Sequence, residues 1–307
     1  GFVVALRAKG ETPEELSGLL DAVLEAATLV PLDDATRERA IDIVGTGGDR
    51  SHSINVSTMS AIVVAGAGVP VCKHGARAAS SQCGTADVLE ALGVAVELSP
   101  EGVKQCVERA GMGFCLAARY HPAFRFAAPS RREIGVPTVF NLLGPMANPG
   151  RVKRQLIGVA NPLVAERMLA SLRLHGSKSS WVVHGGGLDE LTTTGPSTVL
   201  ELRGGQVRTF SVDPVSLGLA PAISEELVGG TPAFNADVVR RVMAGEQGAH
   251  RNIVVLNAGA GLVVADVASS LEEGVAMAAE SIDSGRANET LTKLITESQA
   301  ALAEFGA

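Results

Sequence analysis

Hydrophobic positions recur with two different spacings along this chain, and the two alternate. Short runs rich in β-branched residues are typical of buried strands, and they occur at residues 41–44, 69–72, 94–98, 113–117 and 181–184. Stretches with helical spacing separate them, at residues 85–92, 100–111 and 162–175. This alternation predicts an α/β protein with a mostly parallel sheet, helices on both faces and ligands at the carboxyl ends of the strands.

The N-terminal segment has the pattern of an amphipathic helix. Thr12 is a capping residue, Pro13 takes the first helical position, and Glu15 completes a capping box. Apolar residues then recur at helical spacing, and Pro31 ends the helix. The chain begins inside an earlier apolar stretch without an initiator methionine, so we expect that an N-terminal piece is missing.

Two later regions depart from the alternation. Residues 120–149 contain scattered prolines and basic residues, and they predict helical pieces and loops that cross out of the main domain and return. From about residue 232 the chain is expected to be largely helical, with one strand pair near residues 253–264.

Composition excludes several classes of protein. The net charge of -7 argues against nucleic acid as the main partner, so an anionic ligand must be met by local cations, helix ends or a metal. No apolar run approaches the length of a membrane span. The four cysteines form no C-x-x-C pair and predict reduced thiols in a cytoplasmic protein.

The first predicted strand leads into a glycine turn, with glycines at positions 45, 47 and 48. Asn55, Ser57 and Thr58 follow, directly before an apolar run that predicts a helix. A helix start offers free backbone N–H groups and the positive end of a dipole, which favours an anion such as phosphate. The turn lacks the Lys-Ser/Thr end of a Walker A loop and is not G-x-G-x-x-G, and an ordinary strand-to-helix turn is the alternative.

Two further motifs follow predicted strands. Residues 73–81 combine a lysine, an arginine and two serines around a glycine, which favours a second phosphate site, although a solvated basic loop has the same composition. Asp189 and Glu190 are adjacent carboxylates, and such oxygen ligands suit Mg²⁺; a surface acidic turn is the alternative.

Taken together, the motifs resemble those of the anthranilate phosphoribosyltransferase family. The matching segments are Gly-Thr-Gly-Gly-Asp at 45–49, Asn-x-Ser-Thr at 55–58, Lys-His-Gly-x-Arg at 73–77, Thr-Ala-Asp-Val-Leu-Glu-Ala-Leu-Gly at 85–93, Arg-Arg-Glu-Ile-Gly-x-Pro-Thr-x-Phe-Asn-Leu-Leu-Gly-Pro at 131–145 and Gly-Leu-Asp-Glu at 187–190. They occur in family order, and the resemblance covers essentially the whole chain from Phe2 onward.

The resemblance implies a small helical domain and a large α/β domain of the nucleoside phosphorylase and phosphoribosyltransferase type, with the active site between them. Residues 1–38 would be the remnant of the small domain, joined by about residues 120–149, and residues 39–307 would form the large domain. The implied reaction joins anthranilate to 5-phosphoribosyl 1-diphosphate (PRPP) with Mg²⁺, in tryptophan biosynthesis. A homodimer is expected if the N-terminal helices are present.

The resemblance also assigns roles to individual residues. The donor PRPP would be held by Gly45, Gly48, Asp49, Ser53, Asn55, Val56, Ser57, Thr58, Lys73, His74, Gly75, Ala76, Arg77, Ala78, Ala79, Ser80, Ser81 and Thr85. The metal would be held by Ser57, Asp189 and Glu190. The anthranilate site would comprise Gly45, His74, Ala76 and Arg131, and the catalytic residues would be Lys73 and Arg131.

The chemistry fits these residue types. Departure of the diphosphate develops negative charge, which cations and N–H donors stabilise. The aromatic amine is already uncharged at neutral pH, so no strong base is required. The acceptor needs placement, for which a guanidinium fork on its carboxylate is suited.

The chain departs from the family pattern at three positions. Ala76 stands where the family has an asparagine that contacts the acceptor, and Ser53 and Ala147 each replace a threonine. Ala76 predicts weak anthranilate turnover with near-normal donor binding, or a paralogue with another acceptor. The remaining alternatives are a pyrimidine nucleoside phosphorylase-like enzyme and a catalytically weak protein that binds nucleotides or nucleic acid.

Overall fold

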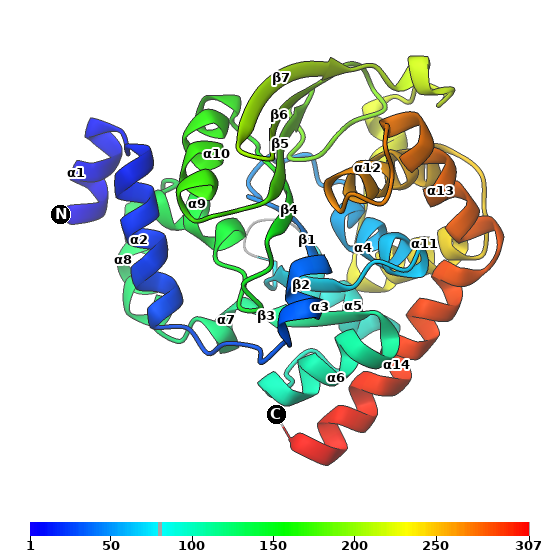
Figure 1. Ribbon diagram of the computed structural model, residues 1–307, viewed down its shortest axis with the longest axis horizontal. Helices are drawn as coiled ribbons and strands as arrows, with labels where there is room; N and C mark the ends of the chain where they lie inside the picture. The colour runs from blue at the N-terminus through cyan, green and yellow to red at the C-terminus, as the bar shows by residue number, and fades with distance from the viewer. Residues whose placement is uncertain (79–81, 307) are drawn as a thin grey trace.

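A seven-stranded sheet organises the molecule, with the strand order β3-β2-β1-β4-β5-β6-β7 (Figure 1). The computed structural model describes residues 1–78 and 82–306. The strands are β1 (Ile41–Gly45), β2 (Val71–Gly75), β3 (Met112–Leu116), β4 (Arg154–Gly158), β5 (Ser179–Gly185), β6 (Ser197–Arg203) and β7 (Gln206–Val212). The first five are parallel, and β6 and β7 add an antiparallel hairpin at one edge. The α/β class with a mostly parallel sheet is therefore confirmed.

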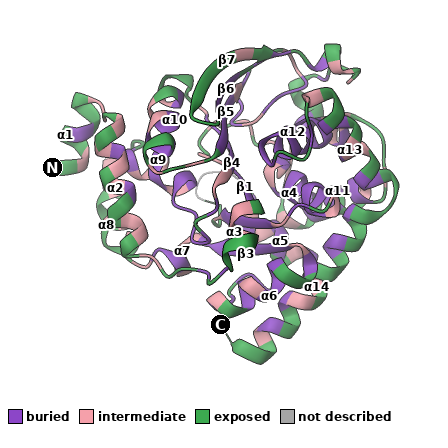
Figure 2. Ribbon diagram, viewed as in Figure 1, coloured by how far each residue is buried: buried purple, intermediate pink, exposed green. Residues whose placement is uncertain are grey.

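One face of the sheet is covered by the helices drawn at the right and bottom of Figure 1. They are α4 (Val56–Gly66), α5 (Thr85–Leu92), α6 (Pro100–Ala110), α11 (Pro232–Met243), α12 (Ala249–Val264), α13 (Leu271–Asp283) and α14 (Arg286–Phe305). Helix α4 packs against β1 and against α12, α13 and α14, and all of these elements share the larger hydrophobic core. Nearly every residue of α4 and α12 is buried (Figure 2), which explains why their sequences are apolar on all sides.

A second hydrophobic cluster lies on the opposite face. Its helices are α1 (Phe2–Lys9), α2 (Pro13–Glu25), α9 (Val139–Met146) and α10 (Ala165–Leu174), with α8 (Phe124–Ile134) beside them. Leu16 and Leu20 of α2 are fully buried there, against α9 and α10. The predicted capping box of α2 is present, because Thr12 Oγ1 accepts from the Glu15 N–H and Glu15 Oε2 accepts from the Thr12 N–H. The helix ends at Glu25, before the predicted Pro31.

The chain crosses from one helical layer to the other at points that lie next to each other. The Thr28 N–H donates to the Tyr120 carbonyl at 2.9 Å, and the Val30 N–H donates to the Pro149 carbonyl at 3.1 Å. Between the two partners, residues 121–148 contain α8 and α9 and no strand. Residues 120–149 are therefore helical and loop-like, as predicted, and both of their ends lie beside residues 28–30. The short helices α3 (Asp34–Arg39) and α7 (Ala117–Tyr120) flank this region.

Two predictions about secondary structure were wrong, and one hairpin was not predicted. Residues 94–98 form no strand, although four of the five are buried. Residues 253–264 belong to the buried helix α12, because an element that is apolar on every side carries no periodicity to distinguish helix from strand. The hairpin of β6 and β7 was missed, although its Gly204-Gly205 turn with positive φ values of 56° and 80° between alternating residues is a typical hairpin signal.

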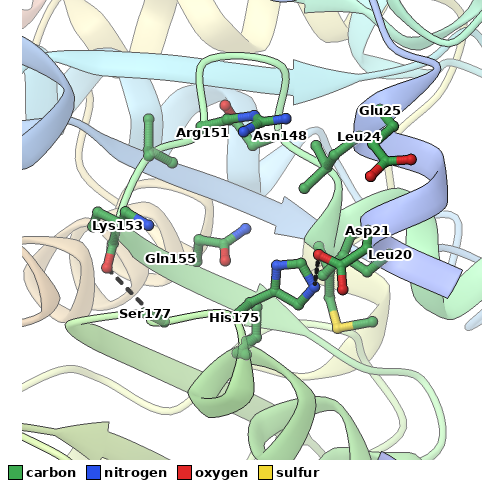
Figure 3. A pocket seen from close by; sticks show the side chains of 13 residues that line it. Leu20, Asp21, Leu24, Glu25, Asn148, Arg151, Lys153, Gln155, His175 and Ser177 are labelled. Atoms are coloured by element: carbon green, nitrogen blue, oxygen red, sulfur yellow. Dashed lines mark hydrogen bonds and ion pairs between the residues drawn. The ribbon is translucent and has the colours of Figure 1, made fainter. Parts of the chain in front are cut away.

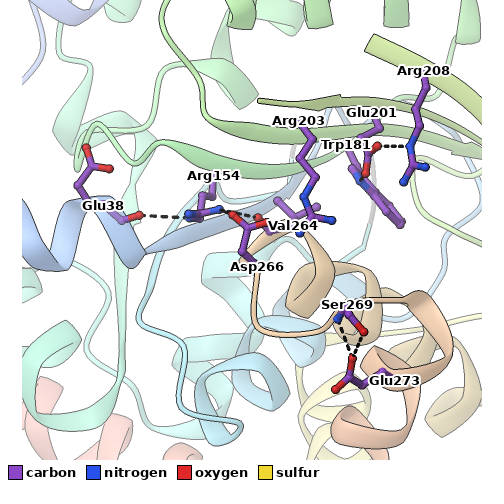
Figure 4. A network of polar contacts seen from close by, with 10 residues as sticks. All are labelled: Glu38, Arg154, Trp181, Glu201, Arg203, Arg208, Val264, Asp266, Ser269 and Glu273. Atoms are coloured by element: carbon purple, nitrogen blue, oxygen red, sulfur yellow. Dashed lines mark hydrogen bonds and ion pairs between the residues drawn. The ribbon is translucent and has the colours of Figure 1, made fainter. Parts of the chain in front are cut away.

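An ionic network fastens the sheet to the end of α12 (Figure 4). Arg154 of β4 and Arg203 of β6 both pair with Asp266, which has a φ of 58° just after the helix. On the same sheet Trp181 donates to Glu201 at 2.8 Å, and Arg208 pairs with that carboxylate.

Among the described residues, no helix is both long and apolar enough to cross a bilayer.

Candidate active site

The predicted ligand site lies where the order of the strands reverses. Strand β1 has β2 on one side and β4 on the other, so the connections from their carboxyl ends leave in opposite directions and open a crevice. The glycine turn follows the end of β1 directly, with φ values of 68° at Gly47 and 80° at Gly48. These left-handed conformations strain any other residue, so the sequence pattern and the backbone agree here.

The acidic segment crosses directly over the ends of β1 and β4. Gly45 and Gly158 are partners in register, and both face Asp189. A Cβ on Gly158 would overlap the Asp189 carbonyl, and a Cβ on Gly45 would lie 2.8 Å from Asp189 Cγ. Gly158 is thus required for the crossing and Gly45 leaves room for the Asp189 side chain; the role of Gly158 was not predicted.

Three carboxylates meet at this crossing. Asp49, Asp189 and Glu190 offer oxygen atoms that all lie within 4.8 Å of one another. Burial, and then the charge of Asp49, raise the pKa of Asp189 to about 7. Burial and the charges of Asp189 and Asp49 also raise the pKa of Glu190, whose Oε2 is buried without a hydrogen-bond partner among the described residues.

This donor set fits Mg²⁺. All of the possible ligand atoms are oxygens, and a bound divalent cation would relieve the repulsion between the three carboxylates. The Gly47 N–H already holds Asp189 Oδ2 at 2.6 Å, which fixes the carboxylate before any cation arrives. Asp49, which was predicted to contact the donor, is a third candidate ligand for the metal. Of the three predicted metal ligands, Asp189 and Glu190 lie together. Ser57 is linked to them through Lys73, which donates to Ser57 Oγ and interacts electrostatically with both carboxylates.

Lys73 lies beneath the site. Its side chain is buried, and its ammonium group donates to the Ile43 carbonyl and to Ser57 Oγ, the latter at 3.2 Å. Burial lowers its pKa to about 8, while Asp42, Glu190 and Asp189 oppose that shift. Lys73 therefore supplies the counter-charge for the acidic cluster, and it does not line the donor cavity.

A cavity of about 370 Å³ opens above the glycine turn. Predicted donor residues that line it are Gly45, Gly48, Asp49, Ser53, Asn55, Ser57, Ala76, Arg77 and Ala78, together with Asp189 and Glu190. Predicted donor residues that are not among its described lining are Val56, Thr58, Lys73, His74, Gly75 and Thr85. Ala79, Ser80 and Ser81 lie outside the described residues. The carboxylates and the predicted anion site therefore share one cavity.

The guanidinium of Arg77 is surrounded by carboxylates. It pairs with Glu90 and with Glu97, with Nη2 at 2.8 Å and 3.2 Å from their Oε1 atoms, and Asp87 lies 3.5 Å away. Asp87 Oδ2 also accepts from the N–H groups of Ala78 and Gly84, at 2.9 Å and 2.8 Å. Arg77 thus holds the segment after β2 against α5.

Two of the predicted acceptor residues, His74 and Arg131, lie at the ends of a row of aromatic rings, whereas Gly45 and Ala76 line the donor cavity. His74 is buried, and burial lowers its pKa to about 3, so the ring is neutral and Nδ1–H donates to the Gly144 carbonyl at 3.0 Å. Arg131 is half-buried, with its guanidinium 5.2 Å from the centre of the Phe140 ring and Nη2 3.4 Å from Asn141 Oδ1. Among the described residues, no carboxylate forms an ion pair with Arg131.

Two further cavities lie near α2 and α1. One, of about 260 Å³, lies between α2, α10 and β4 (Figure 3), where His175 pairs with Asp21 at 3.2 Å; none of the predicted site residues lines it. The other, of about 580 Å³, shares residues 46–48 and Asn141 with the donor cavity and continues toward α1. The second cavity is thus a path of approach to the glycine turn.

A glycine turn at a sheet switch point beside three carboxylates is suited to a phosphorylated substrate and a divalent cation, and the family comparisons identify the class as a glycosyltransferase. The family model described as glycosyl transferase family, a/b domain, matches residues 37–288. The chain is 51% identical to the anthranilate phosphoribosyltransferase of Salinispora arenicola, over 96% of this chain and 85% of that protein. It is 48% identical to the enzyme of the same name from Mesorhizobium japonicum, over 96% and 87%. The chain belongs to the anthranilate phosphoribosyltransferase family.

Solved structures agree with this assignment. The crystal structure of the anthranilate phosphoribosyltransferase from Thermus thermophilus superposes with a TM-score of 0.92 at 43% identity, over 97% of this chain and 88% of that one. The Saccharomyces cerevisiae enzyme in complex with PRPP and Mg superposes with a TM-score of 0.88 at 29% identity, over 97% and 84%.

Proposed function

We propose that this chain transfers the 5-phosphoribosyl group of PRPP to the amine of anthranilate. The products are N-(5-phosphoribosyl)anthranilate and pyrophosphate, and the reaction is a step of tryptophan biosynthesis. The observation that carries the proposal is the buried cluster of Asp49, Asp189 and Glu190 at the rim of the cavity above the glycine turn. The family membership and the yeast structure with PRPP and Mg support it.

The donor is held by the glycine turn and the start of α4. The positive end of α4 favours an anion at this position, whereas the Thr46 and Gly47 N–H groups already donate to the Gly158 carbonyl and to Asp189 Oδ2. Mg²⁺, held by Asp49, Asp189 and Glu190, neutralises the negative charge of the departing diphosphate when it is bound. Lys73 keeps Ser57 and the carboxylates in place from below, so its proposed role is to maintain the site's charge balance.

The acceptor is placed by Arg131. A half-buried guanidinium without a carboxylate partner among the described residues is a suitable receptor for the acceptor carboxylate. The neutral His74 and Gly45 complete the proposed path to the ribose. Because the amine needs no deprotonation before attack, orientation and charge stabilisation are sufficient for catalysis.

We propose a division into two units, in which the second hydrophobic cluster joins the smaller unit to α10 and the sheet. Residues 1–38 with about 120–149 form the smaller unit and the remainder forms the larger one, with the substrates between them. We propose a homodimer, because the side chains of Phe2 and Val4 are exposed on α1. All four cysteines are buried and none forms a disulfide in the described part of the chain, which supports the cytoplasm as the location.

A continuous fluorescence assay tests the activity. Consumption of anthranilate should require both PRPP and Mg²⁺, and Asp189→Ala should abolish it. Phosphorolysis of thymidine in place of this reaction would identify the chain as a nucleoside phosphorylase, and salt-sensitive binding of nucleic acid without turnover would identify it as a non-catalytic binder.

A further inference from the structure

A continuous row of rings joins the sheet to the proposed acceptor residue. His74, at the end of β2, contacts His121 edge to face with ring centres 4.9 Å apart. His121 stacks on Phe124 at 5.1 Å, and Phe124 meets Phe140 edge to face at 5.3 Å. The guanidinium of Arg131 lies over the free side of Phe140. The row therefore begins one residue from Lys73 and ends at Arg131.

We propose that Phe140 and Phe124 are positioning residues that set the place of the Arg131 guanidinium for the acceptor carboxylate. This inference rests on the proposed function and names residues that neither the sequence motifs nor the donor cavity assigned to the acceptor. A guanidinium on a flexible side chain can occupy many orientations, and its fork recognises a carboxylate only in one plane.

Two neighbouring contacts fix that plane. The Phe140 ring supports one face of the guanidinium through a cation–π contact, and Asn141 Oδ1 accepts from Nη2 at 3.4 Å. The same Asn141 oxygen accepts from the Thr138 N–H at 3.0 Å, so it is held by the first turn of α9. The other guanidinium donors have no ion-pair partner in the described part of the chain and are left for a ligand.

The remainder of the row explains why Phe140 itself is fixed. Phe140 is only half-buried, and its contact with Phe124 leads through His121 to His74, which is anchored to the Gly144 carbonyl. Flat rings in van der Waals contact resist compression, because interiors are packed as densely as organic crystals. Through these rings, the position of the Arg131 side chain therefore depends on β2, the strand that carries Lys73.

The test uses two acceptors that differ in one group, anthranilate and the neutral 2-aminobenzamide. In Phe140→Leu the preference for anthranilate, expressed as a ratio of kcat/KM values, should fall by about 3- to 20-fold. The change should lie mainly in KM for anthranilate, with PRPP affinity unchanged by calorimetry. Phe124→Leu should act in the same direction, and Phe140→Tyr, which keeps the ring, should retain the preference.

Phe126→Leu is the matched control. Phe126 lies on the same helix as Phe124 and also carries an arginine over its ring, with Arg125 at 4.8 Å, but it is 75% exposed and outside the row. Equal acceptor preference in Phe140→Leu, Phe124→Leu and Phe126→Leu would overturn the inference while leaving the wild-type activity in place. Absence of anthranilate turnover in the wild type would instead overturn the proposed function, and this inference with it.

Discussion

Replacing Gly45 by alanine tests the link between the glycine turn and the metal cluster. The new Cβ would overlap Asp189 Oδ2 and lie 2.8 Å from Asp189 Cγ, closer than any ordinary contact, so the carboxyl group must move away. That movement breaks the 2.6 Å hydrogen bond from the Gly47 N–H and removes one ligand from the cluster. The backbone of Gly45 has no positive φ, so alanine itself is not strained there.

The expected loss can be worked from this contact. A hydrogen bond to a charged group is worth about 1.5–3 kcal/mol, which corresponds to a decrease in PRPP affinity of about 10- to 100-fold in the presence of Mg²⁺. Folding should be little affected, because the side chain of Asp189 can rotate away. Calorimetric titration with PRPP measures the affinity, and thermal unfolding checks the fold.

Two comparisons make the result decisive. Gly18→Ala, on α2 with nothing within 4 Å of the new Cβ, should leave PRPP binding unchanged and stabilise the helix slightly. In an Asp189→Ala background, Gly45→Ala should change PRPP affinity by less than about twofold, because the group it displaces is already absent. Additive effects of the two substitutions, or wild-type affinity in Gly45→Ala alone, would refute the reasoning.

Further predictions concern pH, the acceptor and the loop after β2. Because burial and Asp49 raise the pKa of Asp189 to about 7, its carboxylate is ionised above pH 7 and protonated below it. The apparent Mg²⁺ affinity should thus fall by about tenfold per pH unit below 7, and Asp49→Asn should move that midpoint to lower pH; a flat profile from pH 5.5 to 8 contradicts this. In the absence of metal, the raised pKa of Asp189 lowers the free energy of unfolding above pH 7. Protonation of the carboxylate at lower pH removes this loss. Ala76→Asn should raise kcat/KM for anthranilate by about 5- to 100-fold with unchanged PRPP affinity, and no gain in steady-state kinetics argues against a missing acceptor contact. Arg77→Gln should weaken PRPP binding no more than the double change Glu90→Gln and Glu97→Gln does, since both break the same two pairs; a much larger loss in Arg77→Gln by calorimetry would show direct contact with the donor.

The sequence predicted those parts of the fold that local patterns determine. The strand at residues 41–44 is short, β-branched and bounded by glycine, and the capping box at Thr12 and Glu15 involves only neighbours in the chain. The helix at residues 253–264 was misjudged because complete burial removes the polar face that identifies a helix.

The candidate site divides in the same way. The residue types at Asp189 and Glu190 predicted a cation, and the structure brings them together with Asp49. The requirement for Gly158 arises from a crossing with a segment about thirty residues later, and no local pattern encodes it. The sequence likewise suggested that Lys73 and Arg77 meet phosphate, but burial of the first and the carboxylates around the second depend on tertiary packing.

The most direct test of the account is a calorimetric titration of the wild-type chain with PRPP, once with Mg²⁺ and once with EDTA. The account predicts saturable binding that requires Mg²⁺ and is weakened in Asp189→Ala. Equal binding with and without the cation, or no binding in either condition, would contradict the central claim that the buried carboxylates and the glycine turn form one metal-dependent donor site.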